Sequence, residues 1–161
     1  MNKIAFVLCE GPHDVAFLYR ILKTEGYVNF SSRIADFPFP INDYLLNSLA
    51  KISFDDLNIA EARKLPLPAE AMFKENSYLL LYAVGGDSKK AVRQEILRKI
   101  NSFIAASDDA INPAAEIELS LLYFFDADNK GVTYRLNEVK NEIVEIINNG
   151  KDDLIIENGN I

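Results

Sequence analysis

Three carboxylates stand directly after apolar runs of this 161-residue chain. Glu10 follows the run 4–9, whereas Asp126 and Asp128 follow the run that begins at Leu119 and ends at Phe125. Carboxylate oxygens are the ligands that Mg²⁺ and Mn²⁺ take in proteins, and a bound divalent cation offsets the charge that develops in phosphoryl transfer. These residue types therefore predict a site for Mg²⁺ or Mn²⁺ that supports phosphoryl chemistry, provided that the two runs end at the same place.

Both runs are predicted to be strands of a parallel sheet. Residues 3–9 show almost no alternation of polar and apolar residues, which is typical of a strand buried on both faces. Open α/β sheets bind their ligands in the crevice beyond the carboxyl ends of the strands. We therefore expect 3–9 and 117–125 to lie side by side, so that Glu10, Asp126 and Asp128 meet at one edge. Their carboxyl oxygens should then fall within about 8 Å of one another. The alternative for the aspartate pair is that it only caps the following turn and helix.

Strands and helices alternate along most of the chain, which predicts a single α/β domain over residues 1–161 with right-handed crossovers. The broad apolar arc of the first helix predicts that this helix is mostly buried. The last predicted strand lacks a covering helix, so either an edge is bare or the chain is a fragment of a longer protein. We expect three layers around a mainly parallel four-stranded sheet, with strands at 3–9, 77–84, 117–125 and 154–156 and helices at 14–25, 88–106 and 132–149.

Residues 27–76 are predicted to be an insertion after the first helix, because prolines and aromatic residues interrupt their short apolar pieces. A helix is expected at about 42–52. A connection of about fifty residues inside a compact domain is rarely unstructured, so we expect a cap over the sheet or beside its carboxyl edge. Three roles remain open for it: a lid that selects substrate, a homodimer contact, or the cover of a sheet edge.

A second group of residues is suited to binding phosphate. Gly85 and Gly86 follow a predicted strand, and paired glycines before a helix let backbone N–H groups approach phosphate oxygens closely. The stretch 88–99 then holds five basic residues against one acid. Lys89 and Arg93 lie in its first turns and are expected to face the same edge of the sheet. The alternatives are a tight strand-to-helix turn and a solvated basic face.

Composition narrows the function. A net charge of −7 argues against a general nucleic-acid coat protein, which is normally basic, but leaves local phosphate contacts open. His13 is the one histidine and Cys9 the one cysteine, so a zinc site is disfavoured, and Cys9 is expected to be a buried thiol. The apolar runs are too short to span a bilayer and no signal peptide is recognisable at the N-terminus, so we expect a cytoplasmic protein with no membrane contact.

The carboxylate motifs resemble those of the Toprim domain, the catalytic module shared by topoisomerases, primases and nucleases of the overcoming-lysogenization-defect (OLD) type. The first motif of that family is a hydrophobic strand, then Glu-Gly, then an Asp that opens a helix, and it matches Glu10, Gly11 and Asp14. The second motif is a strand that closes on Asp-x-Asp, and it matches Asp126 and Asp128.

A third motif also stands at the position in the chain where some Toprim proteins carry it. Between the two carboxylate motifs, the nuclease-like branch often carries a strand followed by Gly-Gly, as Gly85 and Gly86 are here. The resemblance covers most of the chain outside about 27–76, and the small stand-alone Toprim-like proteins are the most similar in kind. It implies a three-layer, Rossmann-like Toprim fold.

The resemblance also implies Mg²⁺-dependent cleavage of phosphodiesters in nucleic acid. It gives Glu10 the role of general acid and base, while Asp126 and Asp128 hold the metal; the alternative for Glu10 is a further metal ligand. It places Gly11 and Asp14 in the substrate-binding part of the site. For Asp14, a first-turn acid that favours the helix dipole is the equal alternative.

Two non-catalytic alternatives stay open, a Toprim-like domain that binds nucleotide or nucleic acid without turnover and an interaction module on the same scaffold. A receiver-like signalling domain is disfavoured, because such domains carry two acids after the first strand and this chain places only Glu10 there. OLD-type nucleases normally have a fused ATPase. The pattern GxxxxGK[ST] is missing from this chain, so an ATP-driven step would need a separate partner.

Overall fold

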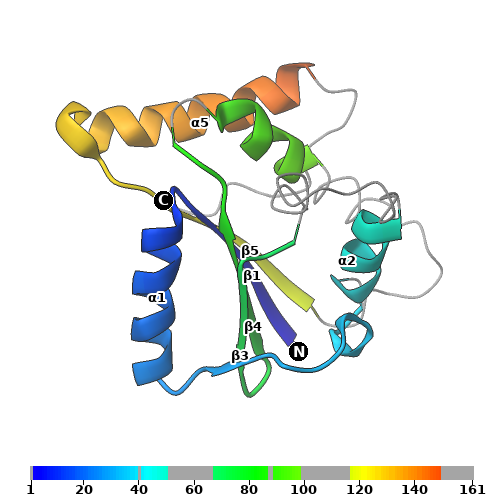
Figure 1. Cartoon of the computed structure of the whole chain (residues 1–161). Coiled ribbons are helices and arrows are strands. Elements are labelled where there is room, and N and C mark those ends of the chain that lie inside the picture. The colour runs from blue at the N-terminus through cyan, green and yellow to red at the C-terminus, as the bar shows by residue number, and fades with distance from the viewer. Residues whose placement is uncertain (1, 40, 51–66, 87–88, 99–116, 150–161) are drawn as a thin grey trace, which may run out of the picture.

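The computed structural model describes five stretches of the chain, and Figure 1 shows them in colour. The strand expected at 154–156 and parts of the helix expected at 88–106 lie outside the described residues. The described residues are 2–39, 41–50, 67–86, 89–98 and 117–149.

A mixed five-stranded sheet in the order β2-β3-β4-β1-β5 forms the centre of the described fold. Three of its strands, β1 (Asn2–Cys9), β4 (Ser77–Ala83) and β5 (Ile117–Phe124), are parallel to one another, with β1 between the other two. The other two, β2 (Val28–Asn29) and β3 (Glu70–Lys74), add antiparallel pairs on the β4 side. The fold is therefore α/β, as predicted, but the sheet differs from the mainly parallel four-stranded sheet that the sequence suggests.

The difference arises from a hairpin that joins β3 to β4 through Glu75 and Asn76. Glu75 adopts a left-handed φ of 55°, a conformation more usual for Gly or Asn. The turn is anchored to the neighbouring strand, because the Lys3 N–H donates to the Asn76 carbonyl oxygen at 2.8 Å. Residues 27–76 thus contribute β2, β3 and α2 (Ile41–Ala50) to the body of the domain, so they are more than a cap.

Helices cover both faces of the sheet, as Figure 1 shows. On one face, α1 (Pro12–Thr24) packs through Val15 against alternate residues of β1, including Val7 and Cys9. On the other, α2 and the helix of residues 90–98 pack against Phe6 and Leu8. Six consecutive residues of β1 are buried, which is what its unbroken apolar sequence predicts.

The first helix is less buried than expected. Val15 is its one buried residue. Phe17 is 56% exposed, although it stacks on Phe124 of the edge strand β5 with ring centroids 6.1 Å apart. Within the described residues, no helix is both long and apolar enough to cross a membrane.

The last described helix, α5 (Val132–Asn149), follows β5 after a short 3-10 turn, η3 (Asp128–Lys130). Its bounds agree with the predicted helix 132–149. Figure 1 shows α5 lying across the end of the sheet at which β1 and β5 finish. This helix therefore borders the edge at which the predicted site should lie.

Candidate functional site

The strand register brings two of the predicted site segments together. β1 and β5 are parallel neighbours, and Cys9 pairs with Phe124 at their carboxyl ends, which confirms the predicted pairing of the two strands. The Glu10 N–H continues the ladder by donating to the Phe124 carbonyl oxygen at 3.3 Å. Glu10 and Asp126 therefore leave the sheet at the same edge, on adjacent strands.

The glycine pair reaches the same edge from the other side of β1. Cys9 is also paired with Ala83 of β4, and the Val84 N–H donates to the Cys9 carbonyl oxygen at 2.9 Å. Gly86 then lies directly against Glu10, since a Cβ atom on Gly86 would come within 2.3 Å of Glu10 Oε1. The strand ends thus place Glu10 after the central strand β1, with its carboxylate against the glycine turn.

One oxygen of this carboxylate is buried without a partner. Glu10 Oε2 is inaccessible to solvent and accepts no hydrogen bond from any described residue. Buried polar atoms are nearly always paired, and an unpaired carboxylate oxygen is costly to bury. Glu10 therefore presents an oxygen ligand in need of a compensating group, of which a divalent cation is one.

The two aspartates make different contacts. Asp126 Oδ1 accepts the N–H of Asp128 at 3.2 Å, which stabilises the turn after β5. Asp128 has a left-handed φ of 47°, and its Oδ2 accepts from Nη2 of Arg135 at 3.1 Å. Arg135 is buried at the first turns of α5 and also donates from Nε to the Asp126 carbonyl oxygen at 3.0 Å. The charge of Asp128 is thus already matched by a guanidinium.

These contacts decide how far the residues fit a metal ion. Within the described residues, no group of three or more His, Cys, Asp or Glu side chains is arranged to hold one, so Glu10, Asp126 and Asp128 do not form a closed three-carboxylate cage. Mg²⁺ is commonly held by one or two carboxylates with water and substrate oxygens completing its shell. Glu10 and Asp126 fit that smaller donor set by residue type. Asp128 is paired with Arg135 through Oδ2, and its role as a metal ligand stays a prediction.

The first-motif residues hold the loop that carries Glu10. Asp14 Oδ2 accepts the Gly11 N–H at 2.8 Å, which closes the start of α1. This contact is the one expected of an acid in the first turn of a helix, and it fixes the backbone immediately after Glu10. His13 is exposed in the same turn.

The two predicted basic residues are placed differently from each other. Lys89 is exposed, and its Cγ packs so closely on Gly85 that a Cβ there would come within 2.4 Å of it. Arg93 is 4% exposed and forms a buried ion pair with Glu142 of α5. The alternative of a solvated basic face is therefore wrong for Arg93, whose guanidinium is bound by a buried partner, while its contact with phosphate stays a prediction.

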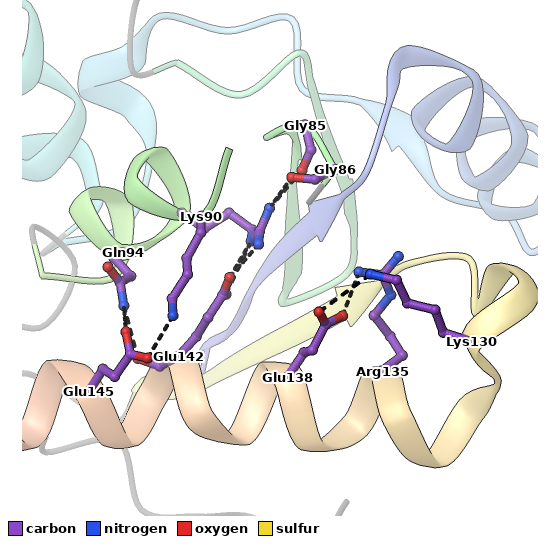
Figure 2. A network of polar contacts seen from close by, with 10 residues as sticks. Gly85, Gly86, Lys90, Gln94, Lys130, Arg135, Glu138, Glu142 and Glu145 are labelled. Carbon is purple, nitrogen blue, oxygen red and sulfur yellow. Dashed lines mark hydrogen bonds and ion pairs between the residues drawn. The ribbon is translucent and has the colours of Figure 1, made fainter. Parts of the chain in front are cut away.

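The sequence gives no signal for a second functional feature, the polar network that Figure 2 shows between α5 and the rest of the site. In this network Glu142 is joined to Arg93 and the glycine turn. Arg135, which Figure 2 shows beside Glu138, also binds the Asp126–Asp128 turn. Charged residues on an amphipathic helix are normally exposed, so Glu142 and Arg135 could not be singled out before their partners were known.

Cys9 is excluded as a nucleophile by its surroundings. Its side chain is fully buried in the sheet, and burial, together with the nearby Asp14 charge, raises the pKa of the thiol to about 11. The reactive thiolate is therefore nearly absent at neutral pH.

Comparisons of this chain with protein-family models, with curated proteins and with solved structures found no match. The functional argument accordingly depends on the residues and geometry described above.

Asp126→Asn is expected to abolish most of the stabilisation by Mn²⁺ without destabilising the metal-free protein. Asn keeps an oxygen that can accept the Asp128 N–H but loses the charge that attracts the cation. A ligand that binds only the folded state adds about 2.7 kcal/mol to the free energy of unfolding at 100 times its Kd. Thermal melts with EDTA and across a Mn²⁺ titration measure both effects.

Asp126→Ala is the control for the turn hydrogen bond, which it removes along with the charge. It should cost about 0.5–1 kcal/mol in EDTA as well as the Mn²⁺ response. A flat Mn²⁺ titration for the unmutated chain would count against a metal site.

Proposed function

We propose that this chain is a Toprim-like domain that carries out Mg²⁺- or Mn²⁺-dependent phosphoryl transfer on nucleic acid, in the form of phosphodiester cleavage. The observation that carries the proposal is the buried, unpaired Oε2 of Glu10 at the carboxyl edge of the sheet. The parallel pairing of β1 with β5 supports it, since Asp126 reaches the same edge.

The proposed fold is the Toprim variant of the α/β class. Its three parallel strands β4, β1 and β5 are each followed by a helix, which is the alternation that the family resemblance implies. The antiparallel β2 and β3 are then additions at one edge, outside the strands that carry the motifs.

Each residue has a distinct proposed role. Glu10 and Asp126 would hold the divalent cation, which supplies compensation for the negative charge that develops on the phosphoryl group. Glu10 would bind the cation through one carboxylate oxygen and act as general acid and base at the other. Asp128 accepts a hydrogen bond from Arg135, and this contact holds in place the turn that carries Asp126. Lys89, exposed beside Gly85, is the described basic residue placed to attract substrate phosphate.

A second candidate is a non-catalytic Toprim-like module that binds nucleotide or nucleic acid. The ion pair between Asp128 and Arg135 favours it, because that pairing leaves fewer carboxylates for metal in the described part of the chain. Such a module would retain binding at the sheet edge without turning substrate over.

A cleavage assay on labelled single- and double-stranded DNA and RNA separates the two candidates. The unmutated chain and Asp126→Asn are each incubated with Mg²⁺, Mn²⁺ or EDTA, and binding is followed in parallel by fluorescence anisotropy. Cleavage that needs metal and is lost in Asp126→Asn supports the nuclease. Metal-dependent binding without products supports the module, and the absence of both contradicts both candidates.

A further inference from the structure

We infer that Arg93 and Glu142 are positioning residues that set the place of the Glu10 carboxylate through the glycine turn. The inference rests on the proposed function in one respect, that the place of Glu10 matters for metal binding. It concerns two residues that lie outside the carboxylate motifs and that act on the site through other groups.

All three nitrogens of the Arg93 guanidinium donate hydrogen bonds. Its Nε lies 3.1 Å from each carboxylate oxygen of Glu142, and its Nη2 donates to Glu142 Oε1. Its Nη1 donates to two backbone oxygens, those of Gly85 at 2.9 Å and Gly86 at 2.6 Å. Arg93 therefore lies between Glu142 of α5 and the carbonyl groups of Gly85 and Gly86, which Figure 2 labels. One side chain therefore fixes both glycine carbonyls to α5.

The glycine turn in turn fixes Glu10. Because Gly86 has no side chain, its backbone contacts the Glu10 carboxylate, and a Cβ there would lie 2.3 Å from Oε1. A displacement of the turn by a few tenths of an ångström would thus move the carboxylate or open a gap beside it. The chain of contacts runs from Glu142 through Arg93 and Gly86 to Glu10.

The same helix also holds the other half of the site. The Arg93 guanidinium lies 5.2 Å from the ring centroid of Phe125, and that of Arg135 lies 5.8 Å from it. Phe125 directly precedes Asp126, whose carbonyl oxygen accepts from Arg135. α5 therefore holds the turns on both sides of Glu10, and the spacing of the proposed ligands depends on this helix.

The burial of the Arg93–Glu142 pair indicates that this pair fixes the geometry of the site. Each side chain is 5% exposed, and the desolvation of two charges cancels much or all of the attraction between them. A planar guanidinium can bind a carboxylate and two carbonyls at once, which a lysine ammonium cannot do in the same arrangement. The pair is thus a weak source of stability but a precise link between α5 and the glycine turn.

A matched control pair joins the same two helices. Lys90 and Glu145 form an ion pair with Nζ 2.6 Å from Oε1, and their side chains are 42% and 45% exposed. A cavity of about 160 Å³ lies between the helices and is lined by Lys90, Arg93, Glu138, Asn141, Glu142 and Glu145. This space can admit water beside a shortened side chain, so a conservative change at Arg93 can be accommodated.

The test compares Arg93→Lys with Lys90→Gln. Arg93→Lys keeps the positive charge but loses the planar fork, so the side-chain carboxyl resonance of Glu10 and the amide resonances of Gly85 and Gly86 should shift in NMR spectra. The Kd for Mn²⁺ alone should rise about tenfold, as for other groups that orient metal ligands. Lys90→Gln should leave the resonances in place and the Kd within about twofold. Gly86→Ala, which displaces Glu10 directly, shows the resonance shift expected of a moved carboxylate.

The outcomes are separable from those of the proposed function. If the unmutated chain binds no Mn²⁺, the proposed metal chemistry fails, yet the Glu10 resonance still decides the positioning role. Unchanged Glu10 resonances in Arg93→Lys would overturn the inference, as would an equal shift in Lys90→Gln, which would indicate general loosening between the helices. Should Arg93→Lys not fold, Glu142→Gln keeps the shape of its side chain and gives the same comparison.

Discussion

Glu10→Gln is expected to lower metal-dependent cleavage by about 10²–10⁴-fold, the range in which a general acid or base contributes to catalysis. Gln matches Glu in shape, so its contact with Gly86 can persist. It cannot act as a general acid or base, and it replaces a charged metal ligand by a neutral one. Single-turnover rates with saturating Mn²⁺ measure the chemical step, and circular dichroism checks that the fold is intact.

His13→Gln is the matched control for this experiment. His13 lies in the turn after Glu10 but is exposed, so its replacement should change the rate by less than about twofold. If Glu10→Gln retains the rate of the unmutated chain, Glu10 has no catalytic role and the non-catalytic module becomes the better account. An equal loss in both variants would instead indicate that the turn itself has been disturbed.

The parallel core of the fold was predictable because its signal is local. β1 contains six consecutive apolar residues and β5 ends in four, and the acids that follow them mark where the strands end. The hairpin from β3 to β4 was not predictable, since its turn uses Glu75 and Asn76 in place of the glycine that usually marks a tight hairpin. β3 also shows no alternation of apolar and polar residues, because its three apolar residues stand together between two charged ones.

The candidate site likewise has one part that could be predicted from the sequence and one part that could not. Glu10 and Asp126 could be assigned to one edge because strand direction and strand ends follow from the sequence. The burial of Arg93 could not be predicted, since arginine is almost never fully buried unless it is paired, and its partner Glu142 lies 49 residues further along the chain. A single sequence does not show which distant charged residues pair with each other. The two partners of a buried ion pair therefore cannot be distinguished in the sequence from two exposed charged residues.

Breaking that buried ion pair should give the largest loss of stability among these variants. Arg93→Leu leaves the Glu142 carboxylate buried with no compensating charge, and removing one partner of such a pair typically costs about 3–5 kcal/mol. It also leaves the carbonyl oxygens of Gly85 and Gly86 without the donor that binds them. Equilibrium unfolding in urea gives the change in the free energy of unfolding, with a constant m value confirming that unfolding remains two-state.

The double variant Arg93→Leu/Glu142→Leu isolates the ionic part of this loss. Two apolar side chains of suitable volume remove the uncompensated charge, so the double variant should be more stable than Arg93→Leu alone. About 1–3 kcal/mol of destabilisation should remain, because the glycine carbonyls still lack a donor. Lys90→Gln/Glu145→Gln, which removes the exposed pair between the same helices, should cost less than about 1 kcal/mol. If the losses for Arg93→Leu and Glu142→Leu simply add in the double variant, the two side chains are not coupled, and α5 does not hold the glycine turn through them.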